Sequence, residues 1–369
     1  MPDKSGREVA VEKKCLILAS GSRLQYRTLR CAAEYFGSVY VLGSNEARPL
    51  SSSRACKAFF EAPVRKDNFQ DLAPDLINTI CADLRIDYIL PSDSITTRYL
   101  TTTRDHLEPR CFPVPSTAVF DILDNKFLFS ELCRELELPY PRSHLAADAA
   151  ALTALAEAGQ IKPPAVAKPL NRDGSSGVTK LVWNSAAELS RQVEYRPILV
   201  QDYICGTDVS AFFLCQGGTD LPWVIYRKDN EKTEFLDMPP VLEACRKINR
   251  HFSYDGVLGF DIRVCPDGSF YFLECNPRFW YNMHLAQLAG LNFVALGFEN
   301  SNRDGPALNI RDVSVAHLRA VPRKVATHWA LDRLDWKILR YFGSDLVSNL
   351  WLLQQRLSKA GRMADGHHL

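Results

Sequence analysis

The chain has 369 residues, which at about 150 residues per domain predicts two or three domains. Apolar residues make up 46% and charged residues 24%, a composition that excludes a mostly disordered chain. The net charge of +1 gives no reason to expect nucleic-acid binding, and no apolar run is long enough for a transmembrane helix. The eleven cysteines include no CxxC pair, so we expect reduced thiols in a cytoplasmic protein.

Residues 14–115 alternate between patterns typical of buried strands and of helices. The strand-like runs are 13–19, 38–44 and 86–92, and the helix-like runs are 24–36 and 69–85. This alternation predicts a doubly wound parallel α/β sheet, whose ligands bind at the carboxyl ends of the strands. Polar turns follow those ends at 20–23, 43–45 and 91–94, and the alternative is that they are only turns.

Residues 116–300 predict an α+β region. Helix patterns occur at 118–138, 147–159, 241–252 and 279–290, and strand patterns at 165–170, 178–183, 198–204, 209–215 and 221–228. The strands are separated by loops of a few residues, which favours antiparallel pairing. A further hairpin is expected at 256–276, because Pro266-Asp267-Gly268-Ser269 is a typical turn sequence.

The last 69 residues are basic and amphipathic. Residues 301–369 hold 11 Lys and Arg against 6 Asp and Glu, and three of the six tryptophans. Leucines and other apolar residues at three-to-four spacing predict two helices, broken at Gly343. Their apolar stripe would pack on the body of the protein, form a homodimer contact or bind a membrane surface.

Two stretches carry candidate chemistry. In AKPLNRDGSSGV (167–178), a strand delivers Lys168 to a loop of small residues whose N–H groups can approach phosphate oxygens; a plain turn is the alternative. On the hairpin, Glu274 and Asn276 share one strand face with Cys275 on the other, and pairing would add Asp261. Such oxygen ligands suit Mg²⁺, and a solvated polar face is the alternative.

Five short stretches, taken in order, resemble the ATP-grasp superfamily of ATP-dependent carboxylate ligases. They are DNKF (124–127), AKPLNRDGSSGV (167–178), VQDYICGTD (200–208), FDIRV (260–264) and ECNPRF (274–279). Their order carries the resemblance, which runs from about residue 14 to about 298. The chain looks similar to D-alanine–D-alanine and L-amino-acid ligases and to the ATP-binding halves of carbamoyl-phosphate synthases.

The resemblance implies four regions. A pre-ATP-grasp α/β domain would span 14–115. One ATP-grasp subdomain with the phosphate loop would span 116–200, and a second with the metal hairpin would span 201–300. A helical basic extension would follow at 301–369.

The resemblance also implies the cofactors ATP and Mg²⁺, with Mn²⁺ as a substitute ion. Lys126 and Lys168 would contact the ATP phosphates, and Lys168 and Arg278 would act in catalysis by steadying the transferring phosphoryl group. The metal ligands would be Asp261, Glu274 and Asn276. Eleven further residues would bind ATP. The loop over the triphosphate would contribute Asp173, Gly174, Ser175, Ser176, Gly177 and Val178. Adenine would contact Gln201, Asp202, Tyr203 and Ile204, and Asp208 would bind the ribose hydroxyls. Two positions depart from the pattern: Gln201 and Asp208 both stand where these enzymes usually have Glu.

The implied reaction joins two small molecules, a carboxylate and an amine. ATP would phosphorylate the carboxylate to an acyl phosphate, and the amine, an amino acid or related metabolite, would displace phosphate. No nucleic acid partner and no transmembrane segment are expected. The alternatives are a biotin-carboxylase-like or other carboxylating enzyme, a nucleotide-binding regulatory protein and a simple kinase.

Overall fold

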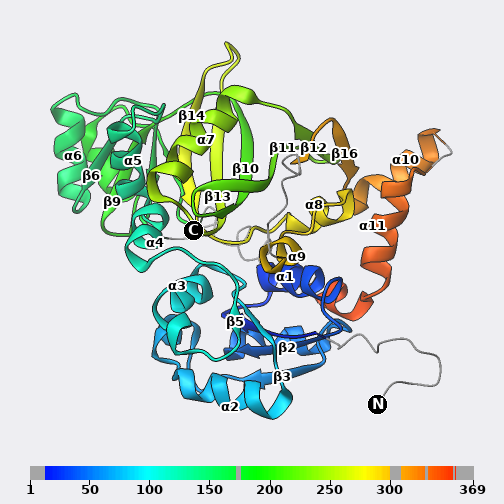
Figure 1. Ribbon diagram of the computed structural model, residues 1–369. Coiled ribbons are helices and arrows are strands. Elements are labelled where there is room, and N and C mark those ends of the chain that lie inside the picture. The colour runs from blue at the N-terminus through cyan, green and yellow to red at the C-terminus, as the bar shows by residue number, and fades with distance from the viewer. Residues whose placement is uncertain (1–12, 172–175, 300–308, 329–330, 352–353, 355–369) are drawn as a thin grey trace, which may run out of the picture.

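The computed structural model describes residues 13–171, 176–299, 309–328, 331–351 and 354, arranged around three sheets (Figure 1). The first is a parallel five-stranded sheet in the order β3-β2-β1-β4-β5. Its strands are β1 (Lys14–Ala19), β2 (Ser38–Gly43), β3 (Ala58–Glu61), β4 (Tyr88–Leu90) and β5 (Arg110–Cys111), with helices α1 (Arg23–Ala33), α2 (Pro74–Leu84) and α3 (Ser94–Thr103). The strand order reverses next to β1, so the ends of β1 and β4 form the switch point where such sheets bind ligands.

The second sheet is small, four-stranded and antiparallel, in the order β6-β9-β7-β8. Two helices, α4 (Thr117–Asp124) and α5 (Lys126–Glu135), precede this sheet and pack in the core of the third sheet. The elements of the small sheet are β6 (Ser143–Ala146), α6 (Ala149–Glu157), β7 (Ala165–Lys168), β8 (Thr179–Leu181), a 3-10 helix at Ala186–Arg191 and β9 (Ile198–Asp202). Side chains alternate along the strands, so Ala165, Ala167 and Val200 form a core with α6. Lys168 and Gln201 therefore lie on the opposite face.

The third sheet is seven-stranded, in the order β14-β13-β10-β11-β12-β16, with β15 paired to β11. Its elements are β10 (Thr207–Gln216), β11 (Thr219–Lys228), β12 (Lys232–Leu236), α7 (Pro239–Phe252), β13 (Gly256–Val264) and β14 (Phe270–Asn276), followed by α8 (Met283–Ala289) and α9 (Phe293–Phe298). Phe213, Ile225 and Phe260 bury one face of this sheet against Ile248 of α7. The mixed α/β and α+β fold expected from the sequence is confirmed.

The C-terminal extension is not purely helical, which corrects our expectation. β15 (Asn309–Ile310) and β16 (Val313–Ala316) add to the large sheet before α10 (Val321–His328) and α11 (Arg333–Gly343) begin. The alternating residues 313–316 find a free edge at β12, so strand pairing satisfies their backbone groups. α11 then runs down to α1 of the first domain (Figure 1). No helix among the described residues is long and apolar enough to cross a membrane.

Candidate functional site

The candidate site lies where the small sheet faces β14 of the large sheet. Lys168 ends β7, and its Nζ donates a hydrogen bond of 3.3 Å to the carbonyl of Leu273 on β14. Lys126 is the first residue of α5, which Asn125 caps by accepting from two backbone N–H groups. Its Nζ lies 3.2 Å from Glu274 Oε2, and both lysine side chains are buried. Lys168 from the small sheet and Lys126 from α5, which packs on the large sheet, thus meet at the β13–β14 hairpin.

The three expected metal ligands lie together on the β13–β14 hairpin. Asp261 is directly opposite Glu274 in the strand register, and Asn276 Nδ2 donates to Asp261 Oδ2 at 3.2 Å. Ser210 Oγ, from β10, donates to the other Asp261 oxygen at 2.8 Å. Cys275 points into the core beneath α7, as strand alternation predicts.

The carboxylates and lysines of this cluster perturb each other. Burial and the neighbouring Glu274 carboxylate raise the pKa of Asp261 to about 7. Burial also opposes ionisation of Glu274, but Lys126 and Lys168 outweigh it and hold the pKa of Glu274 below its usual range. Burial and the charge of Lys126 lower the pKa of Lys168 to about 8, although Glu274 acts in the opposite direction. Two facing carboxylates that resist joint ionisation are a setting that a divalent cation stabilises.

The donor set fits Mg²⁺ bound together with a nucleotide. Asp261, Glu274 and Asn276 offer hard oxygen atoms, which Mg²⁺ prefers. Within the part of the chain that the structure describes, no group of three or more His, Cys, Asp and Glu side chains could hold a metal by itself. The remaining positions around such an ion would therefore be filled by phosphate oxygens and water, as is usual for Mg²⁺.

Arg278 joins the hairpin to the first domain. Its Nη2 donates to Asn276 Oδ1 at 2.8 Å, and its Nε donates to Ser94 Oγ at 3.0 Å. Ser94 begins α3 at the carboxyl end of β4 and donates to Asp124 Oδ1 at 3.1 Å. The expected ligand-binding edge of the first sheet therefore lies next to the phosphate and metal cluster.

The phosphate loop is described only in part. Asp173, Gly174 and Ser175 fall outside the described residues, whereas Ser176 and Gly177 form a turn and Val178 is partly exposed before β8 begins. At the start of the loop, the Leu170 carbonyl accepts a hydrogen bond of 3.2 Å from the Lys126 N–H. This contact places the entrance to the loop beside Lys126.

The residues expected at the base and the ribose lie on the link between the two sheets. Gln201, near the end of β9, is buried, and Asp202 pairs with Arg142 at 3.3 Å. Tyr203 is exposed with Lys180 Nζ 4.3 Å from its ring centroid, and the Ile204 carbonyl accepts from Arg263. Arg263 Nε also lies 2.7 Å from Asp208 Oδ1, so the expected ribose carboxylate already has a cationic partner.

Two serines at the site, Ser210 and Ser143, were not expected from the sequence, whereas Ser94 belongs to the polar turn expected at 91–94. Ser210 bonds to Asp261, Ser94 to Arg278 and Ser143 to Gln201. The partners of Ser210 and Ser143 lie 51 and 58 residues away and depend on strand register.

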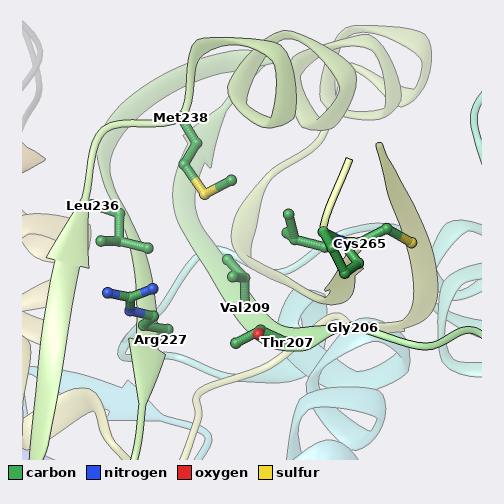
Figure 2. A pocket seen from close by; sticks show the side chains of 9 residues that line it. Gly206, Thr207, Val209, Arg227, Leu236, Met238 and Cys265 are labelled. Atoms are coloured by element: carbon green, nitrogen blue, oxygen red, sulfur yellow. The ribbon is translucent and has the colours of Figure 1, made fainter. Parts of the chain in front are cut away.

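A separate pocket of about 330 Å³ lies on the other face of the large sheet. Figure 2 shows Val209, Leu236 and Met238 lining it. Val209 belongs to the core beneath α7, whereas Asp208 and Ser210 alternate with it and lie on the opposite face. This pocket is therefore not part of the phosphate and metal cluster.

Comparison with known proteins identifies the fold. Residues 194–321 match the family model "ATP-grasp in the biosynthetic pathway with Ter operon". No curated protein sequence matches the chain.

Similar solved structures include an ADP complex of PurK, an N5-carboxyaminoimidazole ribonucleotide synthetase, with TM-score 0.64, 16% identity and 85% of each chain covered. An L-amino acid ligase from Bacillus licheniformis has TM-score 0.58 and 15% identity, covering 79% of this chain and 75% of that one. The biotin carboxylase domain of Hydrogenobacter thermophilus 2-oxoglutarate carboxylase, with MgADP, ADP and bicarbonate, has TM-score 0.60 and 14% identity, covering 79% and 71%. The chain therefore has the ATP-grasp fold, and the resemblance inferred from its five ordered motifs is confirmed.

Proposed function

We propose that this protein is an ATP- and Mg²⁺-dependent ligase that activates a small carboxylate as an acyl phosphate and joins it to an amine. The observation that carries the proposal is the meeting of Lys126, Lys168, Arg278 and the facing Asp261 and Glu274 carboxylates. Phosphoryl transfer requires alignment and neutralisation of negative charge rather than covalent help from the protein. This cluster supplies three cations and a divalent-cation site.

Each group would have a distinct role. Lys126, which contacts Glu274, and Lys168, which contacts the backbone of β14, would bind the ATP phosphates. The ligands of Mg²⁺ would be Asp261, Glu274 and Asn276. A bound Mg²⁺ neutralises phosphate charge. Arg278 is fixed by Ser94 and Asn276, so its guanidinium is oriented before the substrates bind.

The expected regions take corresponding roles. Residues 14–115 would bind the acid and the amine, 116–200 and 201–300 would enclose ATP, and 301–369 would brace the first domain. Residues 173–178 would cover the triphosphate and keep water from the acyl phosphate.

The proposal is tested by measuring phosphate release from ATP and Mg²⁺ across a panel of carboxylic acids, with hydroxylamine as a surrogate amine. An activated acid gives a hydroxamate, which identifies the acid before the natural amine is known. ATP binding without phosphate release for any acid would favour a regulatory nucleotide-binding protein instead.

Bicarbonate is the second candidate acid. The synthetase and biotin carboxylase neighbours support this alternative, since the latter structure is a complex with MgADP, ADP and bicarbonate. Phosphate release that depends on bicarbonate, without any hydroxamate from organic acids, would identify a carboxylating enzyme.

A further inference from the structure

The pocket of about 330 Å³ on the α7 face of the large sheet takes no part in the proposed reaction, but it has the size and the lining of a small-molecule site. Ligand pockets generally measure about 300–1,000 Å³ and are mostly apolar, with a few polar groups that orient the ligand. Val209 is buried in the core beneath α7, and Leu236, Met238 and Val264 pack against the edge of that core. An aliphatic chain placed in the pocket would extend this apolar surface.

Arg227 alone is charged among the described residues that line the pocket. It pairs with Val209 across β10 and β11, so the two side chains share a face, and Figure 2 shows its guanidinium beside Leu236. Its Nε donates to Glu234 Oε2 at 2.7 Å, whereas its two Nη groups have no hydrogen-bond acceptor among the described residues. Two Nη groups of a guanidinium form a planar fork that matches the two oxygens of a carboxylate.

The charges around Arg227 favour a ligand with a single negative charge. Lys232 Nζ lies 2.6 Å from Glu234 Oε1, so one carboxylate is shared by two cations. Hydrogen bonds from Lys232 and Arg227 hold the pKa of Glu234 below its usual range, which leaves one positive charge in excess. Asp237, next to Leu236, is already paired with Arg311 at 3.0 Å. A phosphate ester would bring about −1.5 to −2 charges to this site, whereas a carboxylate brings one.

We propose that this pocket binds a small aliphatic carboxylate, with its oxygens on the Nη groups of Arg227 and its chain against Val209, Leu236 and Met238. The site is separate from the one that would hold the acid substrate of the ligase. Ser210, the next residue after Val209, faces the other side of the sheet, where it bonds to Asp261.

The experiment measures the Kd of octanoate by isothermal titration calorimetry, with no nucleotide present. We expect the wild-type protein to bind octanoate and Arg227→Met to bind it at least about tenfold more weakly, because a charged hydrogen-bonding group is lost. Methionine keeps an unbranched apolar stem, and Glu234 keeps Lys232 as its partner. Octanol, which has no charge, should bind both proteins with similar Kd values. Melting curves check that the variants fold.

Arg250→Met is the matched control for the loss of an arginine. Arg250 also shares a carboxylate, that of Glu243, with a second cation, Arg246, but it does not line the pocket. This variant should bind octanoate like the wild-type protein.

Two further measurements locate the ligand and its chain. Arg278→Met should leave the octanoate Kd unchanged, whereas octanoate bound as a ligase substrate would lose affinity in that variant. Each methylene removed between octanoate and hexanoate should weaken binding by up to about fourfold. No binding by the wild-type protein, an unchanged Kd in Arg227→Met, weaker binding in Arg278→Met or equal Kd values for the two acids would each refute the site.

Discussion

The sharpest structural test concerns Asp345, which attaches the C-terminal helices to the first domain. Its carboxylate is 2% exposed and accepts hydrogen bonds from Tyr26 Oη at 3.1 Å and Ser53 Oγ at 2.5 Å. Arg30 Nη1 of α1 lies 3.8 Å away and is also buried. Asp345→Ala would leave that guanidinium buried without its carboxylate and remove the acceptor for two hydroxyls.

The expected loss of stability at this contact is about 3–5 kcal/mol, the usual cost of removing one partner of a buried ion pair. Asp345→Asn keeps the shape and one acceptor and should lose less. Glu61→Ala is the matched control, because Glu61 also pairs with an arginine, Arg48, at 3.3 Å but is half exposed. An exposed pair of this kind contributes at most about 1 kcal/mol.

The assay is limited trypsin digestion of the native protein, followed by mass spectrometry of cuts within α11 at Arg333, Lys337 and Arg340. Cleavage tracks the population of the opened segment when opening is fast. We therefore expect Asp345→Ala to be cut roughly 100-fold faster or more, and Glu61→Ala to be cut at nearly the wild-type rate. Equal rates for the two variants would refute the anchoring of α11 through Asp345.

Three further predictions concern the site. Glu274→Gln should abolish phosphate release, and it should also lower the melting temperature because it leaves the buried Lys126 without its carboxylate. Cys275→Ala should lower stability by about 1–2 kcal/mol in urea unfolding and keep activity, and an active Glu274→Gln beside an inactive Cys275→Ala would contradict the assigned strand faces. Lys168→Ala should remove roughly 3–4 kcal/mol of transition-state stabilisation, seen as a lower kcat/KM for ATP. An unchanged kcat/KM would show that the ATP phosphates bind away from Lys168. Gly206→Ala should weaken ATP binding and lower the melting temperature, because a Cβ there would lie 2.2 Å from the Val264 carbonyl oxygen. An unchanged Kd for ATP and an unchanged melting temperature would show that the backbone around Gly206 can shift to accept a Cβ.

Sequence patterns predicted the elements whose signals are local. The apolar runs at β1, β2 and β4 and the hairpin around Pro266–Ser269 needed only neighbouring residues. The helix expected at 118–138 is in fact two, because Asn125 caps α5 at the Asn-Lys step, a signal present in the sequence but hidden by continuous apolar spacing.

Other features depended on partners far along the chain. β12 has charged residues that read as a loop, yet it pairs with β11 and with β16, some 80 residues later. For the same reason the strand face of Glu274 was predictable, but its contact with Lys126 was not, since that distance depends on how two sheets meet. Local patterns state which face a residue occupies, and tertiary packing decides what it touches.

The distribution of cores indicates which part of the fold moves most easily. One hydrophobic core continues from Ile17 of β1 through Phe212 of β10 to Ile338 of α11, so the first domain, the large sheet and the extension share buried surface. The small sheet has a core of its own. Displacing the small sheet would leave its own core intact, whereas separating the other parts would open the core that they share. Lys168 and Gln201 lie on the small sheet, whereas Glu274 and Arg278 lie on the part of the fold that shares one core. The sheet with its own core therefore carries part of the proposed nucleotide site. We expect any motion of the small sheet relative to the rest of the chain to occur at its two connections, residues 136–142 and 203–206.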